Sequence, residues 1–132
     1  MTRKLGIIGA GGHGKVVADV AERAGWSEVV FLDARFSSGE LLHSHWSIVK
    51  APESAASIDC DGYFVAIGNS QVRQRWCEWL LSQNLPLVSL ADPSAVVSQY
   101  ATIELGVLIV AGAVVNVDCH LAQGAIVNTR AC

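Results

Sequence analysis

The sequence is poor in charged residues and contains no long apolar run. Only 16% of its 132 residues are charged, the net charge is -3, and the nine Lys and Arg residues form no basic cluster, so a nucleic-acid-binding surface is not expected. Although 52% of the residues are hydrophobic, no stretch approaches the roughly 20 apolar residues of a membrane span. The run from Leu5 to Ala10 is too short for a signal peptide. We therefore expect a cytoplasmic protein, of one domain or of a small domain with a fragment of another.

The cysteines do not follow the spacing of a metal site. They lie among apolar residues at Cys60, Cys77, Cys119 and Cys132. This pattern favours reduced, buried thiols and gives no reason to expect a metal. The four tryptophans are expected to pack in a core or an interface.

A six-residue period of aliphatic side chains runs through the C-terminal third. The aliphatic positions are Val97, Ile103, Ile109, Val115, Leu121 and Val127. Two residues before each lies a small or thin side chain, at Ala95, Ala101, Val107, Ala113, Cys119 and Ala125. A period of six fits neither a helix nor an alternating strand and is typical of a hexapeptide β-helix. The alternative is two or three ordinary strands with turns at Gly106, Gly112 and Gly124.

The repeat is short. Three hexads make one coil, so residues 95 to 132 supply about two coils, whereas stacked repeats usually need about three units to bury a continuous core. Ala131 occupies a small position whose aliphatic partner would be residue 133. We therefore expect the last coil to lack a cap, and its open end to bind a partner chain or to be disordered.

The N-terminal part alternates strand and helix signals. Strands are expected at 4–8, 29–32 and 63–67, and helices at 16–24 and 71–83. This order predicts a parallel sheet with crossover helices. Ligands in such sheets bind at the carboxyl ends of the strands, where all three following loops lie.

The loop after the first strand is rich in glycine. Gly9, Gly11 and Gly14 satisfy G-x-G-x-x-G, and Asp33 lies nineteen residues beyond Gly14, which matches a dinucleotide-binding pattern. Backbone N–H groups of such a loop can approach a diphosphate at a helix N-terminus. However, only about 90 residues precede the repeat, enough for about one mononucleotide-binding half. A histidine and a lysine over the loop suit a diphosphate or a sugar and are not required for NAD.

Taken together, these motifs resemble the sialic acid/sugar O-acyltransferase family. The resemblance is carried by G-A-G-G-H-G-K, F-L-D, A-I-G-N, D-P-S-A-V-V and I-V-N-T-R-A, and it covers essentially the whole chain. It implies an α/β fold, with a small Rossmann-like parallel sheet domain at 1–91 followed by the start of a left-handed β-helix at 92–132. It also implies a UDP-sugar ligand, acetyl-CoA as the co-substrate, trimers formed through the β-helix and a place in polysaccharide biosynthesis.

The resemblance also implies a set of nucleotide-sugar-binding residues. They are Gly11, Gly12, His13, Gly14, Lys15, Asp33, Gly68, Asn69 and Arg73. Alternatives remain for three of them: Gly14 can serve helix packing alone, Asp33 can cap a turn, and Arg73 can be a solvated helix residue. At Ala34 many relatives have a second acidic residue, which puts the sugar or base contact of this loop in doubt.

No catalytic residue is expected in the chain. In the family a catalytic histidine follows the N-T-x-A segment closely, and the sequence ends at that point. His120 lies one position before a core residue of the repeat and is expected to point outward, His43 and His45 lie in a polar segment, and Cys132 has no histidine near it. We therefore expect nucleotide-sugar binding without acetyl transfer or an acetyl-CoA site. The alternatives are an acyltransferase whose remaining residues are absent from this sequence, and an NAD(P)-binding oxidoreductase fragment.

Overall fold

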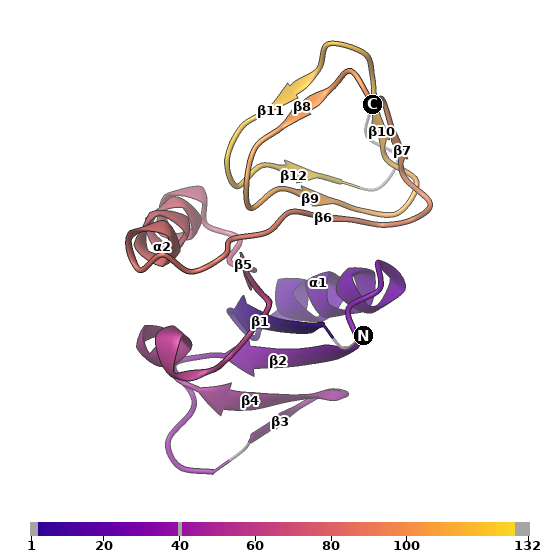
Figure 1. Ribbon diagram of the computed structural model, residues 1–132. Helices are drawn as coiled ribbons and strands as arrows, with labels where there is room; N and C mark the ends of the chain where they lie inside the picture. The colour runs from indigo at the N-terminus through magenta and orange to yellow at the C-terminus, as the bar shows by residue number, and fades with distance from the viewer. Residues whose placement is uncertain (1–2, 40, 129–132) are drawn as a thin grey trace.

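The computed structural model describes residues 3–39 and 41–128. A five-stranded sheet with two helices forms the lower part of the molecule, and a three-sided coil lies above it (Figure 1). The elements of the lower part are β1 (Lys4–Ile8), α1 (Gly12–Arg23), β2 (Glu28–Leu32), β3 (Leu41–His43), β4 (Trp46–Lys50), the 3-10 helix η1 (Pro52–Ser57), β5 (Gly62–Val65) and α2 (Ser70–Ser82). We call this part the sheet unit.

The sheet has the strand order β3-β4-β2-β1-β5. Strands β4, β2, β1 and β5 run parallel to one another. The edge strand β3 pairs with β4 in the antiparallel sense. One face packs against α1 through Leu5, Ile7 and Phe31. The other packs against α2 through Leu32 and Val65. Because both faces are covered, the strands are almost wholly apolar, as buried parallel strands are.

Up to residue 128, where the described part of the chain ends, the coil contains seven two-residue strands arranged on three sides. They are β6 (Leu90–Ala91), β7 (Val96–Val97), β8 (Thr102–Ile103), β9 (Leu108–Ile109), β10 (Val114–Val115), β11 (His120–Leu121) and β12 (Ile126–Val127). All four pairs are parallel and join residues 18 positions apart, so that Leu90 pairs with Leu108 and Leu108 with Ile126. Eighteen residues are three hexads, which confirms the predicted left-handed β-helix. The alternative of ordinary strands joined by glycine turns is wrong.

The interior of the coil follows the predicted positions closely. Its buried centre consists of Val107, Ile109, Ala113 and Val115, and the partly buried side chains around it are Ala95, Val97, Ala101, Cys119, Leu121, Ala125 and Val127. Ile103 is the exception, because it is 36% exposed. The predicted small and aliphatic residues therefore do face one another inside the coil.

The coil packs on the α1 side of the sheet. Leu90, Leu108 and Val110 belong to the same buried cluster as Val17 and Phe64, and α1 lies between the coil and the strands in Figure 1. The β6 strand, at the C-terminal limit of the predicted first domain, already pairs with β9 of the coil. The boundary between residues 91 and 92 stays a prediction.

The structure differs from expectation between residues 41 and 57. The segment with His43 and His45, predicted as a polar loop, contains a β-hairpin. His43 is half-buried, and its ring packs edge-to-face with that of Phe31, with the ring centroids 5.3 Å apart. His45 is exposed, as expected. Of the four cysteines, Cys60 and Cys77 are buried and Cys119 is half-buried, whereas Cys132 lies outside the described residues, as do Thr129, Arg130 and Ala131.

Candidate nucleotide-sugar site

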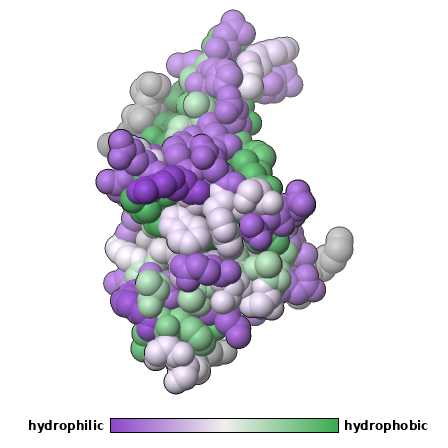
Figure 2. Space-filling view, turned by 90° about the vertical axis from the view of Figure 1, so that its left-hand side faces the viewer, coloured by the Kyte–Doolittle hydropathy of each residue, from purple (hydrophilic) through white to green (hydrophobic). Residues whose placement is uncertain are grey.

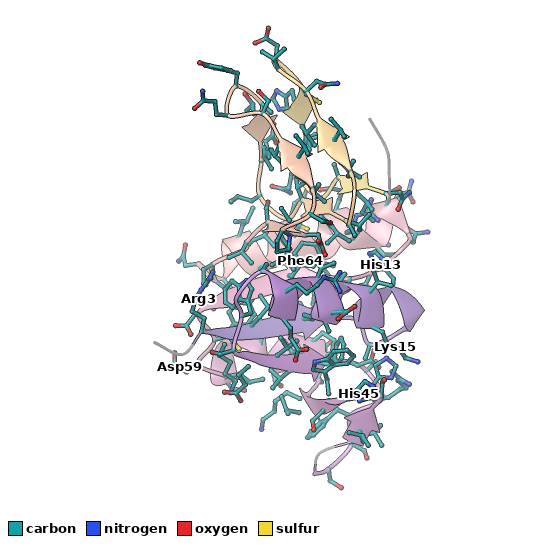
Figure 3. The ribbon with its side chains drawn as sticks, turned by 90° about the vertical axis from the view of Figure 1, so that its right-hand side faces the viewer. Arg3, His13, Lys15, His45, Asp59 and Phe64 are labelled. Atoms are coloured by element: carbon teal, nitrogen blue, oxygen red, sulfur yellow. The ribbon has the colours of Figure 1, made fainter. Side chains whose placement is uncertain are left out.

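Three loops meet at the carboxyl edge of the sheet. The first joins β1 to α1 and contains the glycines, the second follows β2 and begins at Asp33, and the third joins β5 to α2 and contains Gly68 and Asn69. In Figure 3 His13 and Lys15 lie at this end of the molecule, while Arg3 and Asp59 lie at the opposite end. The predicted site residues are therefore brought to one edge by the parallel topology.

The glycines of this edge fall into two classes. Gly9 and Gly14 are required by packing: a Cβ on Gly9 (φ +104°) would lie 2.7 Å from the Ala66 carbonyl oxygen, and one on Gly14 would lie 2.5 Å from that of Gly9. In contrast, a Cβ on Gly11, Gly12 or Gly68 would have no neighbour within 4 Å, and none of the three has a positive φ. The chain's own packing does not explain these three glycines, whereas close approach of a ligand to the backbone would.

The N-terminus of α1 opens toward the same space. Gly11 is its N-cap residue and supplies no side-chain cap. The first N–H groups of a helix have no partner within the helix, and together with the helix dipole they favour an anion. The α1 N-terminus is therefore suited to an anion such as a phosphate group.

Asp33 holds the glycine loop in place. Its Oδ2 accepts from the Ala10 N–H at 2.8 Å, and its Oδ1 accepts from the backbone N–H and Nε of Arg35 at 2.9 and 3.1 Å. The guanidinium of Arg35 also donates to the Ala10 carbonyl oxygen. Burial would raise the pKa of Asp33, but these hydrogen bonds outweigh it and lower the pKa below its ordinary value. The carboxylate is thus ionised and orients the loop.

Two histidines flank the glycine loop. His43 Nε2 lies 3.1 Å from the Gly11 carbonyl oxygen and can donate to it. His13 is half-buried, and within the described residues its Nε2 atom is buried without a hydrogen-bond partner. Burial, and secondarily the charge of Arg73, lower the pKa of His13. A neutral His13 therefore has an unused ring nitrogen beside the loop.

Arg73 is a buried link between the sheet unit and the coil. It is 9% exposed, so the alternative of a solvated helix residue is wrong. Its Nε donates to the Gly124 carbonyl oxygen at 2.7 Å, and its Nη1 to those of Ile67 and Gly68 at 2.9 and 3.0 Å. In the same loop Asn69 is the N-cap of α2, accepting from the Val72 N–H at 3.0 Å. Both side chains therefore shape the loop that carries Gly68.

Lys15 lies away from these contacts. It is exposed and borders a hollow of about 390 Å³ shared with His45 and Trp46 of the β3–β4 hairpin. A different pocket, of about 230 Å³, lies at the carboxyl edge and includes Gly9 and Asp33. A larger hollow, about 540 Å³, is lined by Lys4 and Asp59 at the amino ends of the strands, away from the glycine loop.

Sequence reasoning missed several residues of this edge. Arg35 lies two residues after Asp33 of F-L-D, and that position was a usable signal. Pro52, Glu53 and Trp76 line the 230 Å³ pocket from η1 and α2. Nothing in the sequence pattern relates these segments to the glycine loop.

Comparison with known proteins agrees with this geometry. Residues 4–80, which include the glycine loop, Asp33 and Arg73, match the model of the PglD N-terminal domain. The chain belongs to the PglD N-terminal domain family. The predicted resemblance to sugar acyltransferases is thereby confirmed.

The relatives of this PglD-family chain include acetyltransferases. It is 32% identical over 113 residues to the UDP-N-acetylbacillosamine N-acetyltransferase of Bacillus subtilis, covering 83% of this chain and 52% of that protein. The acetyltransferase domain of PglB from Neisseria gonorrhoeae, in complex with acetyl coenzyme A, is 36% identical with a TM-score of 0.88 and covers 97% of this chain. PerB from Caulobacter crescentus, in complex with CoA and GDP-perosamine, is 31% identical with a TM-score of 0.82 and covers 96%.

The PglD-family chain is shorter than these relatives. It spans about half of the curated relative and 62% and 60% of the two solved chains. Within residues 3–39 and 41–128, no helix is long and apolar enough to cross a membrane, and no three His, Cys, Asp or Glu side chains cluster as metal ligands.

Proposed function

We propose that this chain binds a nucleotide-linked amino sugar, as part of a protein that transfers an acetyl group from acetyl-CoA to it. The diphosphate lies over the α1 N-terminus, against the backbone of Gly11, Gly12, His13 and Gly14. The sugar extends along Gly68 toward the coil. The observation that carries the proposal is the open space above three glycines that the chain's own packing does not require.

The other predicted site residues take different parts in this proposal. Asp33, Asn69 and Arg73 already bond to backbone groups of the site loops, so their main contribution is to hold these loops in position. His13 has a free ring nitrogen for a sugar or phosphate oxygen. Lys15, exposed on the hairpin side, adds positive charge near the diphosphate and is the least direct contact.

The acetyl-CoA part of the proposal rests on the relatives, and the oligomer part on the family resemblance and the surface of the coil. PglB and PerB are described with acetyl-CoA or CoA, and the chain shares their coil fold. Exposed apolar side chains on the coil, Val96, Tyr100 and Val117 among them, are suited to contacts between copies of the chain. A trimer is therefore expected, and a molar-mass measurement by light scattering tests it.

A thermal-shift titration of the 132-residue chain tests the ligand class. A ligand that binds only the folded state raises the melting temperature by mass action. A rise with UDP or GDP and none with NADH supports the proposal. A rise with NADH alone would favour the NAD(P)-binding alternative and refute the proposal.

A further inference from the structure

The 230 Å³ pocket at the carboxyl edge adjoins the proposed diphosphate site. Gly9, two residues before the open glycines, lines it together with Asp33. A nucleotide whose diphosphate lies on the α1 N-terminus could therefore place its nucleoside in this pocket. This step rests on the proposed function.

The walls of the pocket suit a flat aromatic ring. Pro52, Ile67 and Trp76 supply apolar surface, and Trp76 is held edge-to-face by Trp79, with ring centroids 5.3 Å apart. Aromatic and apolar side chains bind nucleobases by stacking, whichever base is present. The walls therefore explain binding of a base and leave its identity to polar groups.

Glu53 is the acidic side chain that η1 adds to this pocket. An ionised carboxylate only accepts hydrogen bonds. Guanine presents two adjacent donors, N1–H and the N2 amino group, which one carboxylate can accept together. Uracil presents a single N–H between two carbonyl oxygens, which a carboxylate repels. Glu53 is exposed at the edge of this pocket, where its carboxylate can accept hydrogen bonds from a ligand.

The segment that carries Glu53 is held rigidly. The phenol of Tyr63 on β5 is buried and donates toward the Ala55 and Ile58 carbonyl oxygens, at 2.9 and 2.6 Å. Burial raises the pKa of Tyr63 to about 12, so the phenol remains a donor at neutral pH. The backbone of the η1 segment is therefore anchored to the sheet close to Glu53.

We propose that this pocket binds the nucleobase of the nucleotide sugar and that Glu53 selects guanine over uracil. The ligand is then a GDP-linked amino sugar, which differs from the UDP-linked sugar expected from the sequence.

Calorimetric titration of the chain with GDP and with UDP tests this assignment. GDP is expected to bind about tenfold more tightly, the lower range for bidentate recognition of a base. In Glu53→Gln, GDP affinity should fall about tenfold while UDP affinity stays level or rises. Asp59→Asn is the matched control: it removes the same charge at the opposite end of the sheet (Figure 3) and should leave both affinities unchanged.

Tryptophan fluorescence gives a second readout. Quenching on GDP binding is expected to disappear in Trp76→Phe and to persist in Trp79→Phe, because Trp76 lines the pocket. The assignment of Glu53 would be overturned by equal GDP and UDP affinities, by a preference for UDP, or by a Glu53→Gln variant that keeps the preference for GDP. These outcomes would leave the proposed function standing. Failure of both nucleotides to bind the wild-type chain would overturn the proposed function as well.

Discussion

Arg73 bonds to Gly124 across 51 positions of sequence, with Nε donating to the carbonyl oxygen at 2.7 Å. Its Nη1 also bonds to the Ile67 and Gly68 carbonyl oxygens. One buried guanidinium therefore joins the third site loop to the coil. The sugar end of the proposed site depends on this link, because Gly68 lies directly in it.

Figure 2 shows the face of the molecule on the α2 side, with mainly hydrophilic and near-neutral side chains below the coil.

Replacing Arg73 should loosen the coil from the sheet unit. Arg73→Met leaves three carbonyl oxygens without a charged donor, and we expect a loss of about 3 kcal/mol in the free energy of unfolding. Arg75→Met, at an exposed position of the same helix, should change it by less than about 0.5 kcal/mol. Urea unfolding measures both, and equal effects would refute the linking role.

Asp92 should make stability depend on pH in acid. Its carboxylate is 3% exposed and is bonded by Arg23 and Ser94. Burial alone would raise its pKa, but the bonds from Ser94 and Arg23 outweigh it and lower the pKa. Since the folded-state pKa lies below the unfolded value of about 3.9, the ionised carboxylate stabilises the fold above that pH. This contribution is lost as the pH falls through the lower folded-state value.

Asp92→Asn should therefore lower the free energy of unfolding by about 2 kcal/mol at neutral pH and flatten the loss of stability below about pH 4. Asp19→Asn removes the other, exposed carboxylate that bonds to Arg23 and should cost less than about 1 kcal/mol. Melting temperatures across this pH range measure the difference. An Asp92→Asn profile as steep as the wild type would contradict the assignment.

Two glycine variants should separate folding from binding. Gly14→Ala places a Cβ 2.5 Å from the Gly9 carbonyl oxygen and should destabilise the fold by about 2 kcal/mol. Gly12→Ala meets no protein atom within 4 Å and, within the first turn of α1, should keep or slightly raise stability. It should weaken nucleotide binding about tenfold, because the added methyl group enters the ligand's space. Unchanged binding in Gly12→Ala would contradict the diphosphate placement.

Alanine substitutions at equivalent repeat positions of the coil should lower the free energy of unfolding by unequal amounts. Ile109 is 1% exposed and Ile103 is 36% exposed, although both occupy the aliphatic position of a hexad. Ile109→Ala should cost about 3 kcal/mol through lost burial and a cavity, and Ile103→Ala less than about 1 kcal/mol. Denaturant midpoints compare the two, and similar losses would indicate that Ile103 is buried in solution, for example between copies of the chain.

The 132-residue chain is expected not to transfer acetyl groups by itself. The histidine of the coil, His120, is exposed and pairs with Glu104 on the outer surface, where it cannot face a buried acceptor. A thiol-detecting assay with acetyl-CoA and a GDP- or UDP-linked amino sugar should show no enzyme-dependent release of CoA. Measurable turnover would contradict this prediction and would require a general base among the residues of this chain.

Local patterns predicted much of this fold because the information lay within short stretches. The hexad period predicted the coil interior, and the glycine loop predicted the β1–α1 turn. The β3–β4 hairpin was missed because its two-residue turn, Ser44 and His45, lacks glycine and asparagine, and Ser44 adopts a φ of +58° that its residue type rarely takes.

The parts of the site that were missed depend on contacts between distant segments. The roles of Arg73 and Asp33 as loop anchors follow from hydrogen bonds to backbone carbonyl and amide groups, which leave no trace in side-chain spacing. The placement of Glu53 beside Gly9 follows from the packing of η1 onto β5. Motif reading predicted a candidate binding edge, whereas the polar residues that we propose to select a ligand there required the three-dimensional arrangement.

The anchoring of η1 by Tyr63 has an evolutionary and practical consequence. The phenol bonds to η1 and its C-cap through the main-chain oxygens of Ala55 and Ile58, so side chains at residues 52 and 53 can change without loss of the anchor. Exchange of residues 52 and 53 between homologues would therefore be tolerated by the scaffold. Such grafts offer a direct route to engineered variants that accept a different activated sugar donor.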